Sequence, residues 1–147
     1  MEPTTLIIFY ASLALGASFL CSILEAVLLS TTHGHIVALK DTHPKISKTW
    51  GDFKDDPEGP LTAILTLNTI AHTVGALGVG HETEAAFGDG DYVIAVSASL
   101  LTIAILLLSE ILPKTIGALY WRKLTVSSAR ILKILMFILL PIVYVIN

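Results

Sequence analysis

Long apolar stretches alternate with short polar ones along the chain. Three of them cover about residues 5–30, 60–80 and 92–112, and a fourth covers about 126–146. Each of the first three is long enough for a membrane-spanning helix, which needs roughly 20 residues. The apolar part of the fourth, residues 131–146, is interrupted only by Lys133 and Pro141. Its roughly 16 residues would cover about 24 Å of a roughly 30 Å hydrocarbon core. The pattern therefore favours three transmembrane helices and a C-terminal helix that lies in the interface, although it leaves open that this helix crosses.

Composition supports a membrane protein. Hydrophobic residues make up 54% of the 147 residues and charged residues only 14%, whereas a soluble domain carries about 25% charged residues. The single cysteine, Cys21, excludes a disulfide framework. There is no G-x-S-x-G or H-E-x-x-H motif, no phosphate loop and no nucleic-acid signature. We therefore expect an all-α integral membrane protein that is not an enzyme, with the lipid bilayer and not a nucleic acid as its partner.

The basic residues predict an orientation. All nine lysines and arginines lie either between the first and second apolar stretches or after the third, whereas residues 80–91 contain four acids and no basic residue. Cytoplasmic loops carry an excess of lysine and arginine. We therefore expect a multi-pass protein of the plasma (inner) membrane with its N-terminus outside and its C-terminus in the cytoplasm.

Several polar residues lie inside the predicted spans. Glu25 follows Ser18 and Ser22 at helical spacing, so the three share one face of the first helix. Asn68 and His72 are similarly spaced on the second. A lone histidine without a cysteine is a poor site for a soft metal, so His72 is more simply a packing or hydrogen-bonding residue. Carboxylates at membrane depth are costly and by default suggest a functional site.

The third span ends in "LLLSEILPKTIGALY", residues 106–120. Pro113 clashes with the carbonyl four residues earlier, which is that of Ser109, and so frees it beside Glu110. A freed carbonyl, a carboxylate, a hydroxyl and an amide make an oxygen cage suited to a hard cation. The same residues also fit interhelical hydrogen bonding, an ion pair with Lys114 or, less readily, a proton relay.

Three motifs resemble a known family. The run "SEILPKTIGALY" at 109–120 is similar to the E-x-x-P-K signature of the transmembrane domain of the CorC and cyclin M (CNNM) magnesium transporters. The run "CSILEAVLLS" at 21–30 resembles the S-x-x-E motif of the first helix of that family, and "LNTIAHTVGA" at 67–76 resembles its asparagine-bearing second helix. The resemblance covers essentially the whole chain, with the motifs in the expected order.

The resemblance implies a domain that transports Mg²⁺, with Na⁺ as the coupling ion. It also implies three transmembrane helices, a belt-like juxtamembrane helix and a homodimer. Ser22, Asn68 and Glu110 match the positions that surround Mg²⁺, and the carbonyl of Ser109 would add a ligand. Glu25 matches the acidic residue of the first helix, and Pro113 and Lys114 match the signature that breaks the helix. Ser18, Glu25 and His72 are candidate ion-pathway residues. The rivals are a non-transporting sensor or anchor with a structural cation site, and a transporter of Mn²⁺ or Ca²⁺.

The chain departs from the family pattern in two ways. Many members have glycine where this chain has Ser109, so a side chain occupies space that glycine leaves free. Members usually continue into cytosolic CBS domains and a further C-terminal domain, and none is present in these 147 residues. The resemblance leaves open whether the chain is truncated or a stand-alone member, and regulation by ATP is not assumed.

Overall fold

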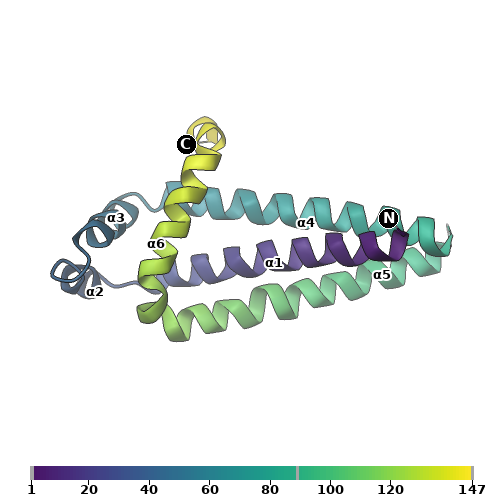
Figure 1. Ribbon diagram of the computed structural model, residues 1–147, viewed down its shortest axis with the longest axis horizontal. Helices are drawn as coiled ribbons and strands as arrows, with labels where there is room; N and C mark the ends of the chain where they lie inside the picture. The colour runs from purple at the N-terminus through teal and green to yellow at the C-terminus, as the bar shows by residue number, and fades with distance from the viewer. Residues whose placement is uncertain (1, 89, 147) are drawn as a thin grey trace. The chain divides into compact units, whose positions relative to one another are not determined.

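The computed structural model describes residues 2–88 and 90–146, and the secondary structure of these residues is entirely helical (Figure 1). The elements are α1 (Pro3–Ser30), α2 (His33–Ala38), α3 (Pro44–Asp55), α4 (Glu58–Phe87), α5 (Asp91–Ala104), η1 (Ile105–Ile111) and α6 (Leu112–Ile146). Three helical stretches are long and apolar enough to cross a membrane: Pro3–Ser30, Glu58–Phe87 and Asp91–Ile146. The prediction of an all-helical chain with three long apolar helices is therefore confirmed.

The helices form two compact units. The first unit comprises Met1–Ser22 and Leu67–Pro113, and the second comprises Ile23–Thr66 and Lys114–Asn147. Helices α1 and α4 each contribute residues to both units. The first unit holds the N-terminal part of α1, the C-terminal part of α4, α5 and η1, and the second holds α2, α3 and nearly all of α6.

In the first unit α1 and α4 pack closely and run antiparallel. A Cβ added to Gly75 would collide with the Cβ of Ala14, and one added to Gly78 would collide with the ring of Tyr10. Gly75 meets Ala14, and Gly78, further along α4, meets Tyr10, which is earlier on α1. The two helices are therefore antiparallel. In lipid, helices associate mainly through packing and hydrogen bonds, so the close approach that glycine permits sets where these two helices meet.

The expected helix break at Pro113 is instead a π-helical segment. η1 covers Ile105–Ile111, and the N–H of Leu112 donates to the carbonyl of Leu107, five residues earlier. Proline has no N–H and crowds the carbonyl four residues before it, so a wider turn accommodates it without ending the helix. The chain consequently passes from α5 through η1 into α6 without a loop.

The second unit contains two helices that the sequence pattern did not reveal, in the polar stretch between the first two spans. α3 buries Trp50 and Phe53. The indole Nε1–H of Trp50 donates to the carbonyl of Thr125 on α6 at 2.9 Å. Lys54 Nζ donates to the carbonyl of Leu28, in the last turn of α1, at 2.7 Å, and burial lowers the pKa of Lys54. This region is therefore a packed helical layer, because a few large side chains are enough to bury one face of a short helix.

α6 begins at Leu112, whereas the sequence predicted a juxtamembrane helix from about residue 126. Its backbone leaves helical geometry at Tyr120, where φ is −109° and ψ is 16°. Before the bend, a Cβ on Gly117 would lie 2.8 Å from the Cβ of Ala26 on α1. After it, α6 crosses the second-unit part of α4 (Figure 1), and a Cβ on Gly59 would lie 3.1 Å from the Cε of Met136. α4 likewise extends beyond the predicted residue 80, to Phe87, because residues 81–87 are compatible with a helix despite their charge.

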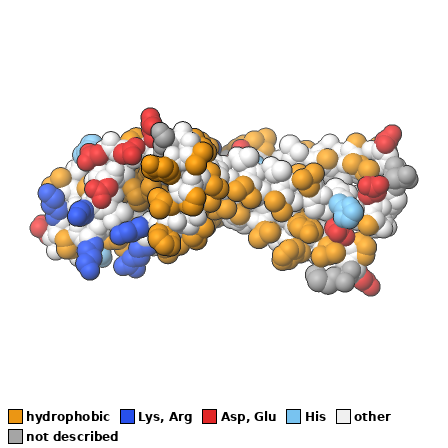
Figure 2. All heavy atoms as spheres, turned by 90° about the horizontal axis from the view of Figure 1, so that it is seen from above, with side chains coloured by type: hydrophobic (Ala, Val, Ile, Leu, Met, Phe, Trp, Pro, Cys, Tyr) orange, Lys and Arg blue, Asp and Glu red, His pale blue; other side chains and the backbone are white. Residues whose placement is uncertain are grey.

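All nine lysines and arginines lie in the second unit and none lies in the first. Figure 2 shows lysine and arginine side chains gathered over the second unit on the visible face. The net charge of the two units therefore differs in sign, because acids occur in both units and basic residues only in the second.

Candidate cation site

Two buried serines on α1 form the centre of the candidate site. Ser18 is 0% exposed and Ser22 is 2% exposed. They are four residues apart, so they lie one above the other on the same helix face. A hydroxyl buried among apolar side chains needs a hydrogen-bond partner, and each of these serines has one on a different helix.

Ser22 connects α1 to η1. Its Oγ–H donates to the carbonyl of Ser109 at 2.6 Å, and the Oγ–H of Ser109 donates to the carbonyl of Leu15 at 3.0 Å. The sequence argument that Pro113 frees the Ser109 carbonyl is consistent with this geometry, since that carbonyl accepts a bond from a side chain on another helix. The side chain of Ser109, at the position where the family that the chain resembles often has glycine, is also accommodated, because its hydroxyl finds an acceptor. The contribution of Leu15 had no signal in the sequence, since any residue offers a carbonyl.

Ser18 connects α1 to α4. The Nε2 of His72 lies 2.8 Å from the Oγ of Ser18, which confirms hydrogen bonding as a role for this histidine. The packing of Ala14 against Gly75 continues the same antiparallel register one turn further along. One turn in the opposite direction, Asn68 lies four residues before His72 on α4, and Ser22 lies four residues after Ser18 on α1. The register therefore places Asn68 opposite Ser22.

Asn68 carries an unsatisfied polar atom. Its Oδ1 is buried and has no hydrogen-bond partner among the residues that the structure describes. Buried polar atoms are nearly always paired, and an exception requires a physical reason. An amide oxygen with free lone pairs at membrane depth, opposite the Ser22 hydroxyl, is a ready ligand for a cation.

The two glutamates of the spans differ in their surroundings. Glu25 belongs to the second unit, where its Oε2 lies 3.1 Å from the Nζ of Lys114. The ion pair that the sequence allowed for Lys114 is thus made by Glu25. Glu110 is half-buried next to Ser109 in the first unit, and within residues 2–88 and 90–146 it takes part in no ion pair. Its negative charge is therefore uncompensated by the side chains around it.

Two other polar residues of the third span, Ser99 and Thr102, bond within their own helix. Ser99 and Thr102 donate to the carbonyls of Ala95 and Ala98, one turn back in their own helix. Side chains that bond their own backbone are satisfied locally. No group of three or more His, Cys, Asp or Glu side chains suited to a metal ion occurs in the described part of the chain. A site here would consequently rest on hydroxyl, amide and carbonyl oxygens with a single carboxylate.

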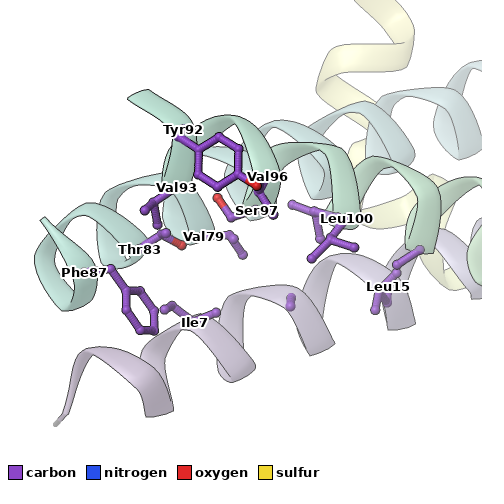
Figure 3. A pocket seen from close by; sticks show the side chains of 13 residues that line it. Ile7, Leu15, Val79, Thr83, Phe87, Tyr92, Val93, Val96, Ser97 and Leu100 are labelled. Carbon is purple, nitrogen blue, oxygen red and sulfur yellow. The ribbon is translucent and has the colours of Figure 1, made fainter. Parts of the chain in front are cut away.

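A large apolar pocket lies elsewhere in the first unit (Figure 3). It has a volume of about 510 Å³ and is bordered by side chains of α1, α4 and α5, including Ile7, Val79 and Leu100. None of the candidate ligands lines it. A smaller groove of about 320 Å³ does reach Ser109, between Phe19 and Leu112. The large pocket therefore contains none of the candidate ligands, whereas the small groove reaches one of them, Ser109.

Comparison with known proteins identifies the family. The sequence pattern of the cyclin M transmembrane N-terminal domain matches residues 9–147. The chain belongs to the CNNM family. A UPF0053 protein of Haemophilus influenzae is 30% identical to this CNNM domain over 98% of the chain and 33% of its own length. A UPF0053 protein of Synechocystis is 27% identical over 92% of the chain and 38% of its own length.

The name of a third relative places that protein in the inner membrane. The Escherichia coli UPF0053 inner membrane protein YfjD is 38% identical over 58 residues, which is 40% of this CNNM chain and 14% of that protein. The chain thus spans from about a seventh to little more than a third of the length of these relatives.

Proposed function

We propose that this CNNM domain transports Mg²⁺ across the inner membrane through an oxygen-lined site in its first unit. The ligands are the Oγ of Ser22, the Oδ1 of Asn68, the carbonyl of Ser109 and the carboxylate of Glu110. Ser18 and His72 flank this set as the next polar pair. Mg²⁺ requires near-octahedral oxygen coordination and keeps part of its water shell, so four protein oxygens and bound water complete the site.

The observation that carries this proposal is the unpaired Oδ1 of Asn68. Leaving a buried acceptor unsatisfied costs about 1–3 kcal/mol. A cation between Asn68 and Ser22 removes that cost by direct coordination. The hydrogen bond from Ser22 to Ser109 opens when the ion binds, because both of its oxygens then turn their lone pairs to Mg²⁺. Without the ion, the Ser22 hydroxyl and the Ser109 carbonyl are therefore paired with each other, whereas the Oδ1 of Asn68 is left without a partner among the described residues.

Charge supports the same assignment. Glu110 has no cationic partner among the described residues, whereas Glu25 is paired with Lys114. An uncompensated carboxylate at membrane depth is costly unless an ion neutralises it. Glu110 is thus the charged ligand, and Glu25 is held out of the site by its ion pair.

The orientation and assembly belong to the same proposal. The cationic second unit lies on the cytoplasmic side and the N-terminus lies outside, an orientation supported by the distribution of basic residues. α6 crosses the ends of α1 and α4 within that unit (Figure 1), as a helix in the interface would. Two copies associate through their transmembrane helices, and Na⁺ entering down its gradient drives Mg²⁺ export.

The test is Mg²⁺ flux into vesicles that contain the purified chain and a trapped Mg²⁺-sensitive dye. We expect flux above that of empty vesicles, faster with an imposed Na⁺ gradient and slowed by Ser22→Ala. Binding of Mg²⁺ without flux would overturn transport and leave a structural site. Flux of Mn²⁺ or Ca²⁺ that excess Mg²⁺ does not inhibit would overturn the choice of ion, and flux unaffected by Na⁺ would overturn only the coupling.

A further inference from the structure

The exposed face of α6 combines positive charge with apolar surface. A shallow groove of about 550 Å³ is lined by Arg130, Lys133, Ile134 and Phe137. Ile134 is 61% exposed and Phe137 is 79% exposed. The opposite face of α6 is packed in the second unit through Leu132 and the residues that follow it at helical spacing. The groove is therefore a second apolar surface, which the fold of this unit does not cover.

The charge of this helix is of one sign. Residues 112–146 contain five lysines and arginines and no aspartate or glutamate. Neither Arg130 nor Lys133 takes part in an ion pair or hydrogen bond in the described part of the chain. The second unit as a whole has nine cations against six acids. The groove thus offers two uncompensated positive charges, three residues apart on the helix and next to exposed apolar side chains.

We propose that this groove binds an anionic phospholipid. The lipid phosphate lies between Arg130 and Lys133, and its acyl chain lies against Ile134 and Phe137. Basic residues on an amphipathic helix at the membrane surface attract anionic lipids, whereas the apolar neighbours favour a lipid over a free anion. A second copy of the chain is a poorer occupant, because a two-fold interface on this face would bring Arg130 and Lys133 against their own copies.

The test measures binding of phosphatidylglycerol and phosphatidylcholine with identical acyl chains to the purified full chain in detergent, by native mass spectrometry. We expect a clear preference for phosphatidylglycerol. Each basic residue near an anionic lipid contributes about fivefold, so the Arg130→Gln/Lys133→Gln double variant should lose about 25-fold in affinity. The Arg130→Lys/Lys133→Arg variant keeps both charges and should retain most of the binding.

Lys45 and Lys48 on α3 provide a matched control. They are also exposed and three residues apart in the same unit, but do not line the groove. The Lys45→Gln/Lys48→Gln variant removes the same charge and should change affinity less than threefold. Equal losses in the two double variants would show general charge attraction and overturn the site. Equal binding of phosphatidylcholine by the unchanged chain would overturn the role of the phosphate charge.

A further arm separates lipid from free phosphate and from self-association. Phe137→Ala should weaken phosphatidylglycerol binding several-fold. Inorganic phosphate that displaces the lipid at similar concentrations, with Phe137→Ala without effect, would indicate an anion site and contradict the proposal. Dissociation of a dimer by Phe137→Ala, with no change in lipid binding, would assign the face to a second copy instead.

Discussion

Replacing Asn68 by leucine separates stability from ion binding. Leucine is close to asparagine in size but has no polar atom. The buried Oδ1 of Asn68 has no partner within residues 2–88 and 90–146, so the protein without ions loses nothing when this oxygen is removed. We therefore expect Asn68→Leu to stabilise the ion-free protein and to abolish stabilisation by Mg²⁺.

The size of the effect follows from the cost of the orphaned oxygen. A buried unsatisfied acceptor costs about 1–3 kcal/mol, and leucine adds a few tenths of a kcal/mol in helix propensity. For a chain of this length each kcal/mol shifts Tm by roughly 2–4 °C, so Tm should rise by several degrees. In the unchanged protein, Mg²⁺ at about 100 times its Kd should add about 2.7 kcal/mol, and Asn68→Leu should lose most of that gain.

The assay is thermal unfolding in detergent, followed by circular dichroism, with EDTA or with saturating Mg²⁺. Thr73→Leu is the matched control, because Thr73 lies on the same helix with an exposed side chain and threonine and asparagine have similar helix propensities. The reasoning fails if Asn68→Leu melts below Thr73→Leu in EDTA, since Oδ1 would then have a stabilising partner. It also fails if both variants respond fully to Mg²⁺.

Two further predictions concern packing. Gly75→Ala should cost about 1–3 kcal/mol through the collision with Ala14 and lower Tm in the same assay. Gly80→Ala is the control: Gly80 has open space around it, so this variant should be neutral or stabilising by up to about 1 kcal/mol. Equal effects of the two substitutions would show that α1 and α4 do not meet at Gly75. Lys54→Met should cost about 1 kcal/mol, because it removes the charged hydrogen bond to the carbonyl of Leu28. The cost is small because burying the lysine charge already offsets part of what this bond contributes. An unchanged Tm would contradict a stabilising role for Lys54.

The spans were predictable because their signal is long and redundant. About twenty apolar residues in succession leave few structures other than a transmembrane helix. The motif around Glu110 marked the end of the third span, where Pro113 follows. Helices α2 and α3 were not predictable. α3 depends on the burial of Trp50 and Phe53, and the hydrogen-bond acceptor of Trp50, the carbonyl of Thr125, lies far along the chain. Propensity alone does not show which polar helix finds a surface to cover.

The sequence showed which polar residues share a helix face, but not which faces meet. Helical spacing placed Ser18 with Ser22 and Asn68 with His72 on single faces, which is a local property. Which faces meet depends on register, and that is set by close packing such as that of Gly75. The sequence also did not show how the helix accommodates Pro113. A long helix accommodates a proline either by a break or by a π-helical turn, and packing against neighbouring helices decides which of the two forms.

The most direct measurement is Mg²⁺ flux in vesicles under a Na⁺ gradient, comparing the unchanged chain with Glu110→Gln, which removes the charge at nearly constant shape. Glu25→Gln is the control, since its carboxylate is paired with Lys114. We predict that Glu110→Gln folds but loses both Mg²⁺ flux and Mg²⁺ stabilisation, whereas Glu25→Gln keeps most of each. Undiminished flux in Glu110→Gln, or no flux in the unchanged chain despite Mg²⁺ binding, would contradict transport through this site.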